Sequence, residues 1–222
     1  MTARLVIVSA PSGAGKTTIT RRLVELQPTK FGLSISATTR EPRKGETEGQ
    51  AYYFLSRPEF ARWKQSGRFL ETAEYAGEWY GTPKSEVDRI LASGRHALLD
   101  IEVVGAEQIR GSWKGEPPIT VFVLPTSPRV LLDRLSERKT ESPEQLLKRV
   151  TRASEELSYS RKYDRLLRND NLEDAVAALG KIVDEGGGFQ RTPPNDMRWV
   201  EQFSNGLREE EVRLHTHLKG ST

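Results

Sequence analysis

The chain has 222 residues, of which 36% are hydrophobic and 29% are charged, so it is long enough for one large domain with a sizeable core. Its 34 basic and 31 acidic residues leave a net charge of +3, which is too small to indicate a surface for duplex nucleic acid. The absence of cysteine excludes disulfide frameworks and thiolate zinc sites, and it fits a reducing cytoplasm.

The first predicted element is a short buried strand formed by the apolar run Leu5–Val8. Residues 9–18 follow with the sequence Ser-Ala-Pro-Ser-Gly-Ala-Gly-Lys-Thr-Thr, and a helical pattern runs from about Thr17 to Leu26. A glycine-bearing turn between a strand and a helix, with Gly-Lys-Thr at the junction, is typical of a phosphate-binding loop. The glycines let backbone N–H groups curl around an anion, and the helix N-terminus adds partial positive charge.

This loop predicts an ATP site. Lys16 is expected to reach the β- and γ-phosphates, and the hydroxyl of Thr17 is expected to hold Mg²⁺. One departure is Ala10, which stands where the strict motif has its first glycine. The alternative, a glycine-rich turn that binds nothing, is disfavoured by the strand-turn-helix context. The expected ATP-binding residues of the loop are Ser12, Gly13, Ala14, Gly15, Lys16, Thr17 and Thr18.

Between residues 38 and 94 the pattern changes to that of a small mixed α/β insertion. A second strand is predicted before it, at Leu33–Ser36. Within the insertion, short strands at 51–55 and 69–75 surround a helix at 57–66, and the Ser56 and Glu59 spacing predicts a capping box. Thr82 is expected to cap a further helix, with Pro83 in its first turn and Gly94 just past its end.

After residue 94 the chain returns to alternating strands and helices. The predicted strands are 96–100, 119–124 and 165–168, and the predicted helices are 103–110, 127–136, 142–158 and 172–184. This alternation predicts an α/β fold with a mostly parallel sheet and helices on both faces. A glycine run at 186–188 then precedes a C-terminal extension with apolar residues at near-helical spacing. Because every predicted core element ends before the glycine run, truncation after Gly187 is expected to leave a folded protein. The alternative is that Phe203 and the apolar residues around it pack on the body or on a second chain.

A series of further motifs follows the phosphate loop in a fixed order. They are Ser36–Glu46, Gly49, Tyr52–Phe54, Glu71, Tyr80–Thr82, Leu99–Glu102, Gly105–Ala106 and Arg134–Arg138. In this order they closely resemble the guanylate kinases, which are P-loop nucleoside monophosphate kinases, over roughly residues 4–184. The resemblance implies a P-loop core at 1–36 and 95–185, a lid at about 136–149, a GMP-binding insertion at 37–94 and an extension at 186–222.

The resemblance also implies a GMP site in the insertion. The residues matching the GMP-phosphate positions are Ser36, Arg40, Arg43, Tyr52 and Tyr80. Two arginines suit a phosphate dianion, because a guanidinium offers charge-assisted, bidentate hydrogen bonds. Glu71 and Thr82 match the positions that read guanine, whose N1–H and exocyclic amine are both donors. Asp100 matches a carboxylate that meets Mg²⁺ or the acceptor nucleotide, and Glu102 stands where the family commonly has a second aspartate.

The remaining matched residues belong to the ATP side. Arg134, Arg138 and Arg149 match the lid arginines, which stabilise charge on the transferring phosphoryl group and complete the catalytic set with Lys16 and Asp100. Asn169 matches a position near the adenine of ATP. Lys139 replaces a glycine that is common after the second lid arginine.

The resemblance therefore implies an enzyme of purine nucleotide metabolism and GMP recycling that transfers the γ-phosphoryl of Mg²⁺-bound ATP to GMP, with closure excluding water. ATP and GMP are the expected partners, without nucleic acid. No membrane partner is expected, because no apolar run approaches about 20 residues, and the expected location is cytoplasmic. A homo-oligomer is left open.

Two other functions compete with this prediction. One is a non-enzymatic guanylate-kinase-like interaction module, which the intact Gly15-Lys16-Thr17 junction disfavours. The other is a related kinase of a sugar phosphate, which Glu71 together with Thr82 disfavours. Nucleic-acid binding through the basic charge is the weakest alternative.

Overall fold

The computed structural model describes residues 2–75, 77–136, 143–186 and 194–220. Its contacts divide the chain into two compact units, residues 1–7 with 20–119 and residues 8–19 with 120–222. The boundary passes through the first strand, β1 (Leu5–Ser9), and the first helix, α1 (Lys16–Leu26). Within the described ranges, no helix has the length and apolar character that a membrane span requires.

The other elements of the first unit lie between residues 31 and 112. Its strands are β2 (Phe31–Leu33), β3 (Ala37–Thr38), β4 (Tyr53–Phe54), β5 (Phe69–Tyr75), β6 (Glu78–Pro83) and β7 (His96–Asp100). Its helices are α2 (Arg57–Gln65), α3 (Lys84–Ala92) and α4 (Val103–Ser112). The second unit contains β8 (Ile119–Leu124), α5 (Pro128–Ser136), α6 (Pro143–Leu157), the 3₁₀ helix η1 (Ser158–Lys162), β9 (Arg165–Arg168), α7 (Leu172–Asp184) and α8 (Pro194–Gly220).

The central sheet has the strand order β2-β7-β1-β8-β9, and both β2–β7 and β8–β9 pair in parallel. Its strands β1 and β8 consist almost entirely of apolar residues, and every residue in them is buried. Runs of this kind are typical of parallel strands that are covered on both faces. The α/β class with a parallel sheet, predicted from the alternation of patterns, is confirmed.

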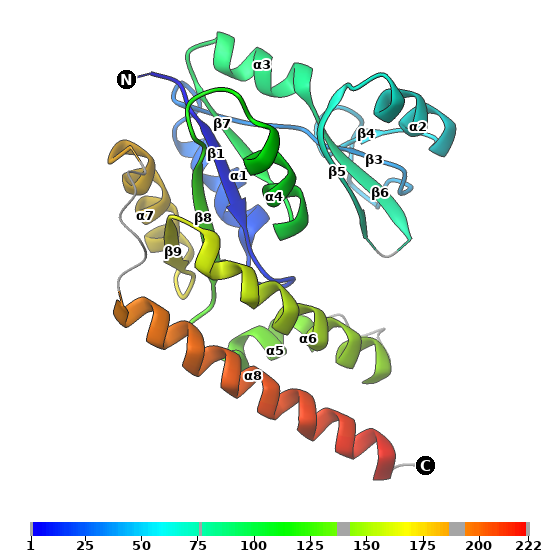
Figure 1. The fold of residues 1–222 in the computed structure, drawn as a ribbon, viewed down its shortest axis with the longest axis vertical. Coiled ribbons are helices and arrows are strands. Elements are labelled where there is room, and N and C mark those ends of the chain that lie inside the picture. The colour runs from blue at the N-terminus through cyan, green and yellow to red at the C-terminus, as the bar shows by residue number, and fades with distance from the viewer. Residues whose placement is uncertain (1, 76, 137–142, 187–193, 221–222) are drawn as a thin grey trace. The chain divides into compact units, whose positions relative to one another are not determined.

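A second sheet in the first unit has the order β4-β3-β6-β5 and packs against α2 (Figure 1). Its small core contains Ala37, Phe60 and Phe69, and the Phe60 and Phe69 rings stack with their centroids 4.6 Å apart. The helix α2 begins with the predicted capping box, in which Ser56 and Glu59 exchange hydrogen bonds. This sheet is built from residues of the predicted insertion.

Two details predicted for the first unit are wrong. Leu33–Ser36 is not one strand, because β2 ends at Leu33 and β3 begins only at Ala37. Between them the hydrogen-bonding partner changes: the N–H of Ser34 still donates to Leu98 in the central sheet, whereas the carbonyl of Ser36 already accepts from Tyr53 in the second sheet. The chain therefore passes from one sheet to the other over these residues.

Thr82 does not cap a helix. It lies in β6, opposite Glu71 of β5, and α3 begins at Lys84 with Pro83 as its N-cap residue. The threonine hydroxyl instead donates to the Glu71 carboxylate, so a pairing across two strands determines its conformation. Gly94 does end α3 as expected, with φ of +77°.

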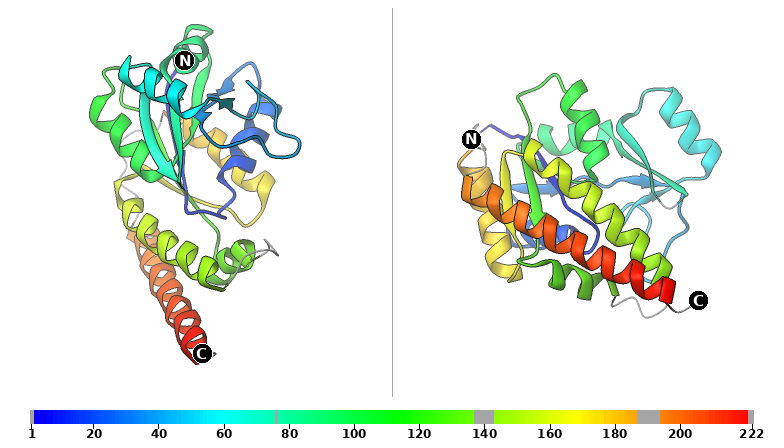
Figure 2. Two further views of the ribbon diagram at one scale, coloured as in Figure 1. Left: turned by 90° about the vertical axis from the view of Figure 1, so that its right-hand side faces the viewer. Right: turned by 60° about the horizontal axis from the view of Figure 1, so that its bottom comes forward.

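The C-terminal extension belongs to the core of the second unit. Its helix α8 lies along α6 and also contacts α5 (Figures 1 and 2). Val200, Phe203 and Leu207 are buried, with at most 4% of their surface exposed. Of the two expectations for the extension, the structure therefore supports packing on the body, and truncation would uncover the apolar surfaces that α8 covers.

Replacing Leu207 by Ala should lower the free energy of unfolding by about 2–5 kcal/mol, because Leu207 is fully buried and its removal leaves a cavity. The matched control is Val212→Ala in the same helix, where the side chain is 65% exposed and a change within about 0.5 kcal/mol is expected. Urea denaturation with an unchanged m-value measures both. Equal midpoints for the two variants would show that α8 is not part of the core.

Candidate active site

The phosphate loop of the second unit has the backbone geometry that its sequence predicts. Gly13 and Gly15 have φ of +82° and +89°, a conformation that is costly for residues with a Cβ atom. The N–H of Ala14 donates to the carbonyl of Pro11 at 3.1 Å, which closes the turn. The helix α1 then begins at Lys16, so the loop leads directly into a helix N-terminus.

Two polar side chains from later in the sequence, Asn169 and Arg134, donate hydrogen bonds to a backbone carbonyl of the loop. The amide of Asn169, only 6% exposed, donates to the carbonyl of Ala14 at 2.7 Å. Arg134 of α5 donates to the same carbonyl at 3.4 Å and to the carbonyl of Asn169 at 3.3 Å. A Cβ atom at Gly15 would lie 2.3 Å from Nδ2 of Asn169, so this contact itself requires glycine. The structure therefore brings Asn169 and Arg134 onto the loop.

Helix α6 holds the loop at Ser12. Arg149 donates to the hydroxyl of Ser12 at 3.3 Å and to the carbonyl of Leu135 at 2.8 Å. The N–H of Ser12 donates to the carboxylate of Glu156 at 3.3 Å, and Arg152 donates to the same carboxylate at 3.1 Å. Arg149, one of the predicted lid arginines, thus contacts the phosphate loop. The third lid arginine, Arg138, lies outside the described residues.

Glu156 was missed by the sequence analysis. It is 6% exposed, although it lies in a helix rich in Glu and Arg whose other acidic residue in that turn, Glu155, is exposed. Its partner Ser12 is 144 positions away in the chain. No local pattern distinguishes a glutamate that holds a distant loop from one that is solvated.

The first turn of α1 carries the ammonium group of Lys16, which suits phosphate, and the hydroxyl groups of Thr17 and Thr18, which suit phosphate or a metal ion. Lys16 is half-buried, whereas Thr17 and Thr18 are exposed. Over the described part of the chain, no group of three or more His, Cys, Asp or Glu residues is placed to hold a metal ion. The hydroxyl groups of the first turn of α1 fit Mg²⁺, because this ion usually keeps several waters and binds through substrate phosphates and few protein groups.

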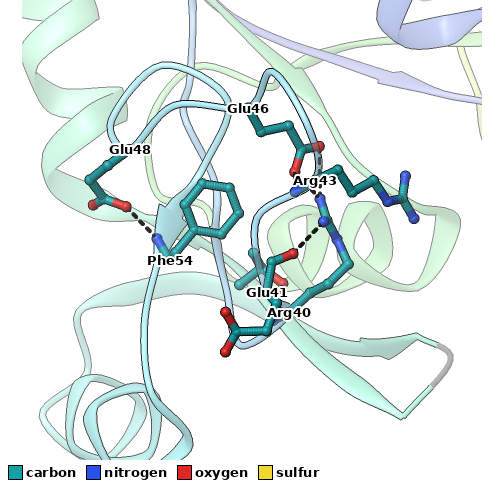
Figure 3. A network of polar contacts seen from close by, with 7 residues as sticks. Arg40, Glu41, Arg43, Glu46, Glu48 and Phe54 are labelled. Atoms are coloured by element: carbon teal, nitrogen blue, oxygen red, sulfur yellow. Dashed lines mark hydrogen bonds and ion pairs between the residues drawn. The ribbon is translucent and has the colours of Figure 1, made fainter.

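In the first unit, Arg40 is the centre of a polar cluster (Figure 3). Its Nη2 lies 2.9 Å from both carboxylate oxygens of Glu46, and its Nη1 donates to the carbonyl of Glu41 at 2.6 Å. The guanidinium also lies over the Tyr52 ring, 5.4 Å from the centroid. Tyr52 and Tyr80 meet edge to face, with centroids 6.0 Å apart. The structure therefore brings together three of the predicted phosphate ligands.

Hydrogen bonds within this cluster shift the pKa values of Glu46 and Arg40. Burial acts to raise the pKa of the Glu46 carboxyl, but hydrogen bonds from the Arg43 backbone and the Arg40 guanidinium lower it below its ordinary value. Burial acts to lower the pKa of Arg40, but hydrogen bonds with Glu46 and Tyr80 raise it overall. Both groups therefore stay charged at neutral pH, and Glu46 holds the Arg40 guanidinium in place.

The other two predicted phosphate ligands are placed by the backbone. The N–H of Arg43 donates to Glu46 at 2.8 Å, and its guanidinium extends away from the Arg40–Glu46 pair (Figure 3). Ser36 is half-buried, and its carbonyl accepts from the N–H of Tyr53 at 2.9 Å. This bond joins the segment of Ser36 to the segment that carries Tyr52.

Glu86 is a second carboxylate that the sequence analysis missed. It accepts hydrogen bonds from the Tyr53 hydroxyl at 3.0 Å, from Arg89 at 2.9 Å and from the N–H of Ile35 at 3.5 Å. Burial acts to raise its pKa, but the hydrogen bonds from Arg89 and Tyr53 lower the pKa overall. Ile35 and Tyr53 adjoin Ser36 and Tyr52, so this buried carboxylate fixes the two segments that carry phosphate ligands.

Glu71 and Thr82 form a buried pair on neighbouring strands. The Thr82 hydroxyl donates to Oε1 of Glu71 at 2.7 Å. Thr82 is 0% exposed and Glu71 is 6% exposed. On the other side of the carboxylate lies α4, where a Cβ atom at Gly105 would come within 2.6 Å of Oε2. Gln108 of α4 also exchanges two hydrogen bonds with the backbone of Thr72, at 2.8 and 3.1 Å. The carboxylate therefore has one narrowly defined position.

Asp100 and Glu102 lie on the same unit, at the end of β7 and at the N-cap of α4. Both are half-buried, and Glu102 makes no capping hydrogen bond with its side chain. The predicted GMP-binding residues are all present in this unit.

Comparison with known proteins identifies the family. The sequence model of guanylate kinase matches residues 2–186. The chain belongs to the guanylate kinase family. Among curated relatives, it is 44% identical to a guanylate kinase of Synechocystis sp. over 182 residues, covering 82% of this chain and 94% of the relative. It is 42% identical to a guanylate kinase of Clostridium perfringens over 179 residues, covering 81% of this chain and 82% of the relative.

A solved guanylate kinase has the same fold. The crystal structure of guanylate kinase from Anaplasma phagocytophilum matches with a TM-score of 0.68 and 26% sequence identity. The match covers 91% of this chain and 96% of that chain. The P-loop kinase fold predicted from the sequence is confirmed. The helix α8 lies beyond the residues that the guanylate kinase model matches.

Replacing Gly105 by Ala should raise the KM for GMP roughly tenfold and leave the KM for ATP unchanged. The added methyl group would displace the Glu71 carboxylate, and overpacking of this kind typically costs about 1–3 kcal/mol. Gly111→Ala is the matched control, because it lies in the same helix and a Cβ atom there meets nothing within 4 Å. Identical GMP constants for both variants would mean that Gly105 does not set the position of Glu71.

Proposed function

We propose that these residues form the ATP and GMP sites of a guanylate kinase, which transfers the γ-phosphoryl of ATP to GMP and releases ADP and GDP. The observation that supports guanine as the acceptor base is the buried Glu71 carboxylate, oriented by Thr82 and Gly105. A carboxylate only accepts hydrogen bonds, and guanine offers two adjacent donors, N1–H and the exocyclic amine. A base without these donors would leave a buried charge unsatisfied.

The ATP phosphates bind at the phosphate loop and the N-terminus of α1. The positive φ of Gly13 and Gly15 suits a loop whose backbone N–H groups would bind the phosphates, and Lys16 at the start of α1 would add a full positive charge. The Thr17 hydroxyl would hold Mg²⁺ together with the phosphate oxygens. When bound, this ion neutralises phosphate charge and makes the phosphorus more susceptible to attack.

Arg134 and Arg149 supply the cations of the lid. Both already contact the loop backbone or Ser12, so their guanidinium groups are held near the expected position of the phosphates. Charge that develops on the transferring phosphoryl group is stabilised most by donors that need no reorganisation. Arg138 is proposed for the same role on the resemblance alone. Catalysis then rests on positioning and charge, without a covalent enzyme intermediate.

On the acceptor side, Arg40, Arg43, Ser36, Tyr52 and Tyr80 would bind the GMP phosphate. Arg40 is already oriented by Glu46 and by the Tyr52 ring, so little side-chain entropy is lost when phosphate binds. The carboxylates of Asp100 and Glu102 would orient the acceptor nucleotide. The cytoplasmic location and the division into core, insertion and extension stay predictions from the sequence.

Lys16→Ala should abolish ADP formation in a coupled assay with ATP and GMP while leaving thermal unfolding nearly unchanged. The half-buried lysine serves the phosphates and lies outside the apolar core. Lys181→Ala is a matched control, because its side chain is 78% exposed in α7 and it should leave the rate unchanged. A folded Lys16→Ala variant with a normal rate would remove the role assigned to the loop lysine.

GMP should be preferred strongly over AMP, because adenine has neither the N1 proton nor the 2-amine. A site built around such hydrogen bonds rejects a ligand that lacks them by up to roughly 10⁴-fold. Glu71→Gln should reduce this preference mainly by lowering kcat/KM for GMP, since the amide presents one donor where only acceptors fit. Steady-state kinetics with both nucleotides measure the ratio. Equal use of AMP and GMP by the wild-type chain would refute the guanine site.

A further inference from the structure

The helix α8 makes an apolar contact with both helices that carry lid arginines. Its buried residues Val200, Phe203 and Leu207 lie on one face, and the helix runs along α6 and against α5 (Figure 2). On α6, the residues buried in the same unit include Val150 and Ala153, both fully buried. Val150 directly follows Arg149 in this helix.

Hydrogen bonds add to the apolar contact between α8 and α6 and limit movement of one helix along the other. The Glu211 carboxylate accepts hydrogen bonds from the hydroxyls of Thr151 and Ser154, in the turn that follows Arg149. Arg161 lies in η1, which follows α6, and it donates to Glu201 at 2.7 Å. The first pair lies in the second half of α6 and the last contact in η1, so α8 is bonded at two places along this part of the chain, which opposes sliding of the two helices.

The contact with α5 is close and lies near its first turn. A Cβ atom at Gly206 would come within 2.9 Å of Cγ of Pro128, the first residue of α5. The indole N–H of Trp199 donates to the carbonyl of Thr126 at 3.3 Å, just before this helix. Arg168 directly precedes Asn169 in the chain, and its guanidinium lies over the Trp199 ring, 4.5 Å from the ring centroid. α8 therefore also contacts the segments that precede Arg134 and Asn169.

We propose that α8 is a brace that positions Arg134 and Arg149, with Gly206 and Glu211 as positioning residues. α8 contacts both α5 and α6, and the residues of α6 that bond to Glu211 lie on the side of that helix opposite the residues that hold Ser12. Arginines on braced helices keep their contacts with the loop, which reduces the reorganisation needed for transfer. The inference rests on the proposed role of these arginines toward ATP.

The test compares full-length variants by steady-state kinetics and by hydrogen exchange of α5 and α6. Gly206→Ala inserts one methyl group between α8 and Pro128 without removing any contact. Glu211→Gln weakens the bonds to Thr151 and Ser154. Each should lower kcat roughly tenfold, because small misplacements of catalytic groups are costly, while the KM for GMP stays unchanged. Exchange in α5 and α6 should become faster.

Two matched controls separate bracing from general effects. Gly111→Ala makes the same helical glycine substitution in open space, and Glu209→Gln removes the charge of an exposed glutamate in α8. Both should retain the kcat and the exchange rates of the wild-type chain. Circular dichroism and thermal unfolding confirm that every variant is folded at the assay temperature.

The outcomes distinguish this inference from the function on which it rests. An unchanged kcat for Gly206→Ala and Glu211→Gln, with Arg149→Ala strongly impaired, would overturn the brace and retain the lid. An unchanged kcat for Arg149→Ala would instead refute the role of that arginine toward ATP. A higher KM for GMP in the α8 variants, with kcat unchanged, would also overturn the brace.

Discussion

The carbonyl of Ala14 is the group on which the ATP side depends. It accepts hydrogen bonds from both Asn169 and Arg134, and this pairing requires the loop to turn at Gly13 and Gly15. A loop whose N–H groups converge on an anion must direct its carbonyls outward, where they need donors of their own. One donor directly follows β9 and the other lies in α5, so satisfying the loop carbonyl also holds Arg134 against the phosphate loop.

In the first unit, carboxylates with several hydrogen bonds have the corresponding role. Glu46 orients Arg40, Glu86 joins the segments that carry Ser36 and Tyr52, and Thr82 orients Glu71. In each case a charged group has its hydrogen bonds within one unit, which offsets the cost of removing it from water. These side chains are therefore held in defined positions without a ligand.

Helix α8 extends this preorganisation to the lid. Its apolar face and the Glu211 bonds support α6 on one side, while Arg149 and Glu156 connect α6 to Ser12 on the other. Because protein cores are close-packed, a helix held on two sides transmits small shifts with little loss. The extension is thus continuous with the active site through one helix.

The sequence alone determined the phosphate loop, the parallel α/β class and several element boundaries. The strand 119–124 and the helix 172–184 match the structure at both ends, because an apolar run and a capping asparagine are local signals. Tertiary structure decided the rest. Ser34–Ser36 change sheets, Thr82 pairs across strands, and Glu86 and Glu156 bond to residues far away in the chain. The partner of a polar side chain depends on long-range packing, and no local pattern encodes it.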